Sequence, residues 1–263
     1  MISLERIKAL VQQEWYISKR SLEVIMDLPF FAVIDVMLFG YVAQYLVGSA
    51  ETEAAYYLLL GAVFWESIRI TQYSMTVSSL WNVWSRNLSN MFITPLSLTE
   101  YISAHMISGV LKSTVITSGL IVLTAVVFDF NVLVIGWWNV LFCFINLVMF
   151  SWSVGLVLLG LIFRYGVRVQ ALGWAVIFIF QPLSAAFFPV AVLPPVLQTF
   201  AKLLPPTYVF EAARGNLLDP SINWSLMLTA VVINAVYLTA AVIIFKRLFV
   251  ASTDTGQFAR NES

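Results

Sequence analysis

Charged side chains are scarce in this chain of 263 residues, making up 11% of it, whereas a typical soluble domain carries about a quarter. The 14 acidic residues balance the 14 lysines and arginines, so the chain lacks the basic excess of a nucleic-acid-binding protein. Apolar residues make up 60%, and they recur in runs of about 18 or more, the length typical of transmembrane helices. The composition therefore predicts a polytopic membrane protein with little soluble mass.

Cysteine and histidine are almost absent, with Cys143 and His105 the single examples. One cysteine excludes an intrachain disulfide. A single cysteine and a single histidine are too few ligands to favour a zinc or haem site. The sequence contains no G-x-x-x-x-G-K-[ST] loop, no G-x-S-x-G and no H-E-x-x-H, the motifs for binding ATP phosphates, for a serine nucleophile and for catalytic zinc. We expect the chain to bind no cofactor or metal and to have no catalytic site of its own.

Six apolar segments are predicted to cross the membrane as helices, at about 28–47, 54–80, 102–128, 132–163, 169–189 and 224–245. The fourth exceeds the roughly 20 residues that a span needs, which predicts tilting, and the fifth is predicted to kink near Gln181–Pro182. The fold class is thus an all-α membrane protein with one domain over 1–263. Its parts are a cytoplasmic amphipathic helix at 1–27, five spans in 28–190 with a polar connection at 81–100, a hairpin at 191–223, a sixth span at 224–246 and a tail at 247–263.

The first 20 residues have the pattern of an amphipathic helix. Leu4, Ile7, Val11 and Trp15 fall at helical spacing, with polar and basic residues between them. Such a helix lies along a membrane surface or packs on a partner.

The distribution of basic residues predicts the orientation. Six spans place both termini on one side, and the positive-inside rule assigns the side richer in lysine and arginine to the cytoplasm. With the N-terminus inside, ten of the 14 basic residues are cytoplasmic, namely Arg6, Lys8, Lys19, Arg20, Arg86, Arg164, Arg168, Lys246, Arg247 and Arg260. Both termini are therefore predicted to be cytoplasmic. The membrane is expected to be a plasma (inner) membrane of prokaryotic type.

Four charged residues fall inside predicted spans: Asp35, Glu66, Arg69 and Lys112. Such groups are costly in lipid and face the bundle interior, a cavity or a partner. Glu66 and Arg69 are three residues apart on one helix face, which favours a structural ion pair. The alternative is that Asp35, Glu66 and Arg69, with Gln181, line a passage for a polar or amphiphilic substrate. Lys112 is expected to extend toward the cytoplasmic surface, with Asp35 as another possible partner.

The polar connection at 81–100 is predicted to contain a short amphipathic cytoplasmic helix. Leu88, Met91 or Phe92, and Pro95 fall close to helical spacing, and Pro95 should end the helix just before it. Exposed apolar residues on such a helix suit docking to a soluble partner. A helix resting on the lipid interface explains the pattern equally well.

The segment 191–223 is too polar and too rich in proline for an ordinary span. Two proline pairs, Pro194–Pro195 and Pro205–Pro206, predict the starts of two short helices, at about 196–204 and 208–218, because proline is tolerated in the first turn of a helix. Lying between two spans on the outer side, these helices are predicted to form a re-entrant hairpin. Irregular backbone at membrane depth requires packing against protein or a wet cavity.

Two segments resemble signatures of the type-2 ABC transporter permeases (the ABC-2 family). The first is SRNLSNMFITPLSLTEYI, with the family's "PLS…E" pattern at Pro95, Leu96, Ser97 and Glu100. The second lies before the last span, and its matching positions are Leu193, Pro194, Leu197, Gln198, Pro206, Tyr208, Glu211, Arg214 and Gly215. With the span count, the resemblance covers nearly the whole chain, and the overall pattern is nearer the short drug-efflux and nodulation-type permeases than the capsule exporters.

The resemblance implies a permease subunit of an ATP-driven exporter. Members work as two permease subunits, here expected to be a homodimer, with two cytoplasmic ABC ATPase subunits that hold ATP and magnesium. The first helix and the connection would dock on these ATPases, through Arg86, Leu88, Met91, Phe92, Pro95, Leu96, Ser97 and Glu100. The hairpin would form an outer gate, through Pro194, Pro195, Pro205, Pro206, Tyr208, Glu211, Arg214 and Gly215. The substrate would be an amphiphilic compound, a drug or a glycan or glycolipid, moving along a path lined by the first, second and fifth spans.

Two other classes remain open at this point. A gradient-driven transporter could use Asp35, Glu66 and Arg69 as a relay. A membrane-embedded lipid or glycan transferase would need a cluster of acid and base groups, and the candidates are Glu211, Arg214 and Asp219, or Glu100 and His105.

Overall fold

The computed structural model of the protein describes residues 2–49 and 51–254, and this part of the chain is helical, with no strand. The predicted all-helical fold is confirmed. The elements in order are α1 (Leu4–Arg20), α2 (Leu22–Ile25), the π-helical turn η1 (Met26–Phe30), α3 (Phe31–Gly48), α4 (Thr52–Trp84), α5 (Leu88–Ile93), α6 (Leu98–Val127), the 3-10 turn η2 (Val132–Ile135), α7 (Trp137–Tyr165), the 3-10 turn η3 (Gly166–Val169), α8 (Leu172–Leu183), the 3-10 turn η4 (Val190–Val192), α9 (Pro195–Ala201), α10 (Pro205–Gly215) and α11 (Trp224–Asp254).

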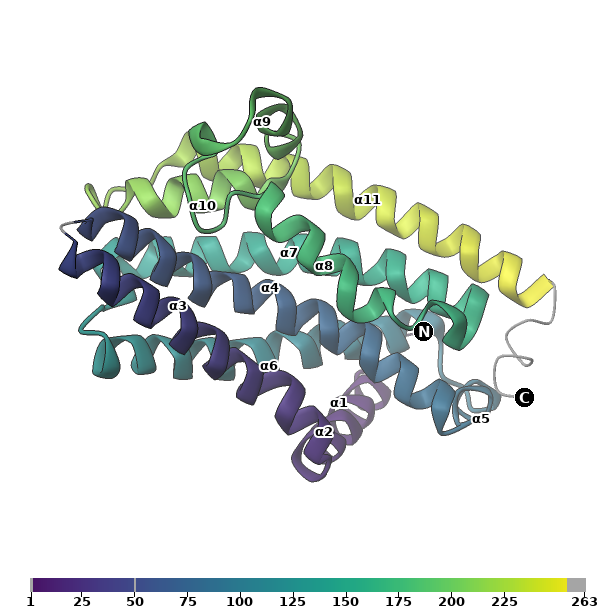
Figure 1. Ribbon diagram of the computed structural model, residues 1–263. Coiled ribbons are helices and arrows are strands. Elements are labelled where there is room, and N and C mark those ends of the chain that lie inside the picture. The colour runs from purple at the N-terminus through teal and green to yellow at the C-terminus, as the bar shows by residue number, and fades with distance from the viewer. Residues whose placement is uncertain (1, 50, 255–263) are drawn as a thin grey trace.

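The long helices α3, α4, α6, α7 and α11 lie side by side as a bundle (Figure 1). Helix α4 lies within the bundle and contacts α3, α6, α7 and α8. Short α5 lies at one end, and α9 and α10 lie toward the other (Figure 1). Helix α1 packs across α6 at the side of the bundle.

Three helical segments are long and apolar enough to cross a membrane: Leu98–Val127, Trp137–Val169 and Trp224–Asp254. Helix α4 is just as long, with 33 residues, but carries Glu66 and Arg69 near its middle. Almost every residue from Leu59 to Val83 is buried, which fits a helix surrounded by protein. Some of its polar side chains bond to neighbouring helices, as Ser78 does to Glu14 and Asn82 to Tyr101.

The predicted fifth span is shorter than expected. Helix α8 covers only Leu172–Leu183, with 12 residues. At 1.5 Å per residue it is about 18 Å long, against the roughly 30 Å thickness of a bilayer core. The expectation of one kinked helix over 169–189 is wrong, because the helix ends next to Pro182 and the backbone turns at Ala185, whose φ is +52°.

Two other predicted spans differ in extent. The fourth is divided at Gly136, whose φ of +92° is readily adopted by glycine, into η2 and α7. The sixth predicted span continues beyond residue 245, since α11 ends at Asp254. The end of α11 bonds to the end of α7: Arg164 donates to the carbonyl of Ala251, and Ser252 Oγ donates to the carbonyl of Phe163 at 2.6 Å. Arg260, counted in the charge distribution, lies outside the described residues.

A buried charge pair fastens α1 to the bundle. The carboxylate of Glu14 accepts hydrogen bonds from Ser78 Oγ at 2.7 Å and from Lys112 Nζ at 3.1 Å, and His105 Nδ1 lies 3.9 Å away. Burial raises the pKa of Glu14, but the nearby charges of His105 and Lys112 and these hydrogen bonds leave that pKa below its ordinary value. The expectation that Lys112 extends to the surface or pairs with Asp35 is wrong, because Glu14 gives it a partner inside the protein.

The Glu14–Lys112 pair predicts an asymmetric response to mutation. Lys112→Met leaves a buried carboxylate without its cation, and we expect the free energy of unfolding to fall by about 3 kcal/mol. The double variant Glu14→Gln/Lys112→Met removes both charges, and its free energy of unfolding should fall by less than that of Lys112→Met. Thermal unfolding in detergent measures both variants, with Lys8→Met, at an exposed position on α1, as the control. An unchanged melting temperature for Lys112→Met contradicts the role of the pair.

Candidate functional site: a polar cavity, a docking turn and a fastened hairpin

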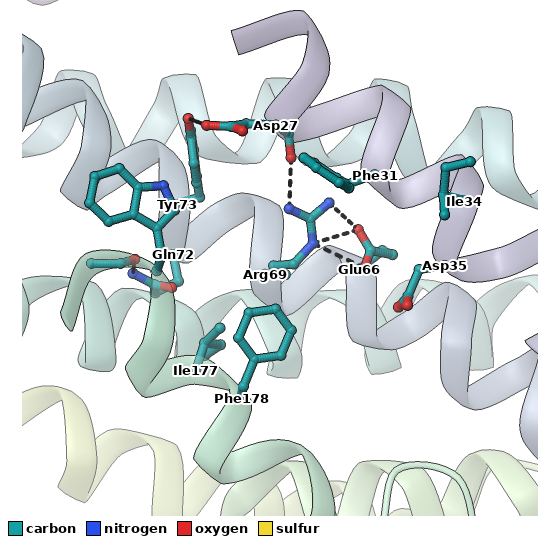
Figure 2. A pocket seen from close by; sticks show the side chains of 12 residues that line it. Asp27, Phe31, Ile34, Asp35, Glu66, Arg69, Gln72, Tyr73, Ile177 and Phe178 are labelled. Atoms are coloured by element: carbon teal, nitrogen blue, oxygen red, sulfur yellow. Dashed lines mark hydrogen bonds and ion pairs between the residues drawn. The ribbon is translucent and has the colours of Figure 1, made fainter. Parts of the chain in front are cut away.

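A cavity of about 310 Å³ lies between the start of α3, the middle of α4 and α8 (Figure 2). Charged, amide and aromatic side chains line it together with aliphatic ones. The lining residues are Asp27, Phe31, Ile34, Asp35, Glu66, Arg69, Gln72, Tyr73, Gly173, Trp174, Ile177 and Phe178.

The guanidinium of Arg69 organises one wall of the cavity (Figure 2). Its Nε lies 2.8 and 3.0 Å from the two carboxylate oxygens of Glu66, and its Nη2 lies 2.5 Å from Glu66 Oε2. Its Nη1 donates to the carbonyl of Asp27 at 2.8 Å and its Nη2 to that of Leu28 at 3.2 Å. The predicted Glu66–Arg69 ion pair is therefore present, and it also binds the backbone before α3.

Those two carbonyls lie in an irregular turn of the backbone. Pro29 lies in the π-helical turn η1, has no N–H to donate and disturbs the regular ladder of backbone hydrogen bonds. The charged donors of Arg69 reach the carbonyls of Asp27 and Leu28 in this turn. The widened turn and Arg69 thus support each other.

Further bonds from α4 fix the other edges of the cavity. Tyr73 Oη donates to the carboxylate of Asp27 at 2.5 Å. Gln72 Nε2 donates to the carbonyl of Gly173 at 3.0 Å, which joins α4 to α8. Asp35 lies beside Glu66 and faces the same space (Figure 2).

Helix α5 presents one side to the bundle and one to the surroundings. Leu88 is buried, Met91 and Phe92 are half-buried, and the ring of Phe92 lies 5.6 Å from that of Tyr101. Ile93, in contrast, is 82% exposed. Most of the apolar residues predicted to dock on a partner thus pack inward, and Ile93 is the exposed apolar residue of the helix.

The turn around α5 has a defined set of exposed residues. Helix α5 ends at Ile93, as Pro95 predicted, and Leu96 beyond it is half-buried. Arg86 has a φ of +53° where the chain leaves α4. We call the exposed residues of this turn the α5 tip: Arg86, Asn90, Ile93, Thr94 and Pro95.

Glu100 connects α1 to α6. Its carboxylate accepts from the backbone N–H of Ser97 at 2.8 Å, in a capping box, and from that of Ser3 at 2.6 Å, and it pairs with Arg6 at 3.1 Å. Arg6 also donates to the carbonyl of Pro95. Glu100 is buried and connects the start of α1 to the start of α6 behind the α5 tip.

The proline-bounded segment forms two short helices, as predicted. Helix α9 begins at Pro195 and α10 at Pro205, each with proline in its first turn. Tyr208 Oη donates to the carbonyl of Lys202 at 2.8 Å and so links the two helices. Gly215 ends α10 with nothing near the position of a Cβ and no positive φ, so nothing in the structure explains a requirement for glycine there.

A second buried arginine fastens α10. Arg214 Nη2 lies 2.8 Å from Glu211 Oε1, and its Nη1 donates to the carbonyl of Ala185 at 2.9 Å. Its guanidinium carbon lies 5.9 Å from the centre of the Tyr57 ring on α4. Glu211 in turn accepts from the N–H of Val190 at 2.9 Å. Glu211 and Arg214 therefore hold α10 against the irregular segment that follows α8.

A comparison with protein-family models matches residues 5–218 to the ABC-2 type transporter model. The chain belongs to the ABC-2 type transporter family. The matched region includes the cavity, the α5 tip and both short helices, and stops before α11. A search of the curated proteins finds no match for the chain. As a member of this family, the chain is a multi-pass membrane protein and a permease component of an ABC transporter, which associates with ABC ATPase partners.

For this ABC-2 permease, the structure brings together part of the predicted set of intramembrane polar residues. Asp35, Glu66 and Arg69 share the cavity, whereas Gln181, near the end of α8, is not among its lining residues. Sequence reasoning missed Asp27 and Gln72. Asp27 lies directly before the first predicted span and two residues before Pro29. Gln72 follows Arg69 by three residues on one face of α4. The sequence therefore contained a signal for both residues.

The acid and base groups considered for an enzyme have other partners. Glu100 bonds to Arg6, and His105 lies beside Glu14. Asp219 accepts from the backbone N–H and the hydroxyl of Ser221, which lowers its pKa, while Glu211 and Arg214 bond to each other and to the backbone. The bonds give structural roles to Glu100, Asp219, Glu211 and Arg214.

Arg214 provides a test of the fastened hairpin. Arg214→Gln leaves Glu211 and the carbonyl of Ala185 without their charged partner, so we expect a loss of about 3 kcal/mol in the free energy of unfolding. Limited proteolysis should then cut first in 184–204. Lys202→Gln, at an exposed position, is the matched control. Wild-type stability and digestion in Arg214→Gln would argue against this role.

Proposed function

We propose that the chain is the membrane-spanning permease subunit of an ATP-driven ABC exporter. It works as a dimer of two copies, with two separate cytoplasmic ATPase subunits that hold ATP and Mg²⁺. The observation that carries this proposal is the α5 tip, which exposes Ile93 inside the family-matched region. The Arg6–Glu100 ion pair and aromatic packing support the tip from behind.

The proposed topology has six crossings and both termini in the cytoplasm of a prokaryotic cell, in the plasma (inner) membrane. The crossings are η1 with α3, α4, α6, α7, α8 with the segment after it, and α11. The start of α1 bonds to the start of α6 behind the α5 tip, and the described end of α11 lies at the same end of the bundle (Figure 1). Helices α9 and α10 then lie on the outer side as a re-entrant gate.

Coupling follows from the contacts behind the α5 tip. When the ATPases close on ATP, they push on the tip, and Arg6 and Glu100 transmit the push to α1 and α6. Asn82 on α4 donates to Tyr101 Oη on α6 at 3.1 Å, so α4 moves with them. The same helix carries Glu66 and Arg69, so the motion reaches the cavity wall.

The cavity between the first, second and fifth crossings is then part of the substrate path. Its mixture of charged and aromatic side chains suits an amphiphilic compound or drug, or the head of a glycolipid. Substrate leaves past the outer hairpin, where Arg214 and Glu211 hold the closed arrangement.

Gentle purification of the chain from its native membrane tests the proposal. We expect a soluble ATPase to co-purify in stoichiometric amount and to hydrolyse ATP. A preparation without an ATPase, under conditions that keep other membrane complexes intact, would overturn the proposal and favour a transporter driven by an ion gradient.

Ile93 gives the sharpest prediction for coupling. Ile93→Glu places a charge in the proposed docking surface but, at an exposed position, should leave the fold intact. We expect ATPase co-purification or transport-linked ATP hydrolysis to fall by about tenfold. Leu218→Glu, also an exposed apolar residue (75%) but in the segment after α10, serves as the control for ATPase co-purification. Equal ATPase co-purification by the two variants would count against docking through the tip.

A further inference from the structure

The cavity walls point to a specific class of ligand. We propose that this cavity binds an organic cation that carries an aromatic or apolar group, an assignment that rests on the permease function proposed above. The inference comes from the charges, the rings and the size of the cavity.

The charge of the lining is unbalanced. Three carboxylates line the cavity, those of Asp27, Asp35 and Glu66, and among its described lining residues Arg69 is the single basic one. The donors of Arg69 already bond to Glu66 and to the backbone carbonyls of Asp27 and Leu28. An anionic ligand would have to displace Glu66 and would face the remaining carboxylates. A cation instead finds a carboxylate, that of Asp35, beside an ion pair that is already formed.

Aromatic rings surround this acidic wall. Phe31, Tyr73, Trp174 and Phe178 line the cavity, and rings at such positions attract cations through their π-faces. Phe31 and Phe178 are 53% and 51% exposed, so the cavity opens between them at the surface of the chain. A ligand can place its charge near Asp35 and its apolar part along these two rings.

The size of the cavity narrows the substrate class further. A volume of about 310 Å³ is at the lower end of ligand sites, which range over about 300–1,000 Å³. A single drug-sized cation matches this space, and a polysaccharide does not. Among the candidates in the proposed function, the cavity favours small amphiphilic cations over glycans.

Direct binding tests the assignment on the full chain, purified with its partners into lipid nanodiscs. The probe is radiolabelled 1-methyl-4-phenylpyridinium, a permanent aromatic cation. Its competitor is biphenyl-4-carboxylate, an anion of similar shape. We expect saturable binding of the cation and no competition by the anion.

Two variants connect the binding to the cavity. Asp35→Asn keeps the size of the side chain but removes its charge, and it should weaken cation binding by about tenfold or more. Phe178→Leu, at a half-exposed position, should weaken it by about threefold. Glu53→Gln makes the same chemical change as Asp35→Asn at an exposed site at the start of α4, and it should bind as the wild type does.

The outcomes separate the cavity assignment from the permease function. Wild-type affinity in Asp35→Asn, competition by the anion, or no cation binding by a preparation that retains an active ATPase would overturn the cavity assignment and leave the permease proposal in place. Asp35-dependent binding in a preparation with no ATPase would support a cation site and overturn the ATP-driven mechanism.

Discussion

The guanidinium of Arg69 is the contact on which the centre of the bundle depends. It neutralises Glu66 and satisfies the backbone carbonyls of Asp27 and Leu28 in the turn widened around Pro29. In a low-dielectric interior, a carboxylate without these donors would cost free energy. The bonds of Arg69 tie the turn before α3 to α4 and form one wall of the cavity.

Ion pairs with a buried basic side chain also lie where peripheral helices meet the bundle. Lys112 and Glu14 hold α1 against α6, and Arg214 with Glu211 holds α10 against the irregular segment after α8. Buried charges in this chain therefore lie at joints, because ordinary spans need none and irregular backbone needs donors and acceptors at membrane depth. If the chain works as proposed, these joints transmit motion between the α5 tip, the cavity and the outer hairpin.

Much of the fold was predictable from local signals. Long apolar runs predicted α6, α7 and α11, and the proline pairs predicted the starts of α9 and α10. Pro95 predicted the end of α5. These features depend on nearby residues, for which hydrophobic length and proline geometry are sufficient.

What the sequence did not reveal depended on contacts between distant segments. The pairing of Lys112 with Glu14 joins residues 98 positions apart, and periodicity carries no information about such a contact. The short α8 was hidden because the apolar composition of 169–189 continues past Leu183, where the helix ends. In the cavity, the charged residues Asp35, Glu66 and Arg69 were predictable as a set, whereas the π-helical turn and the bonds of Arg69 to its carbonyls became apparent only when α3 and α4 were packed together.

Hydrogen exchange on the purified permease–ATPase complex, with and without ATP, measures most directly whether the α5 tip is connected to the cavity. If α4 transmits the motion, ATP should change the exchange of backbone amides in 26–34 and in α8 as well as in α5. Changes confined to α1 and α5, with 26–34 and α8 unaltered while ATP is hydrolysed, would contradict transmission through α4 to the cavity.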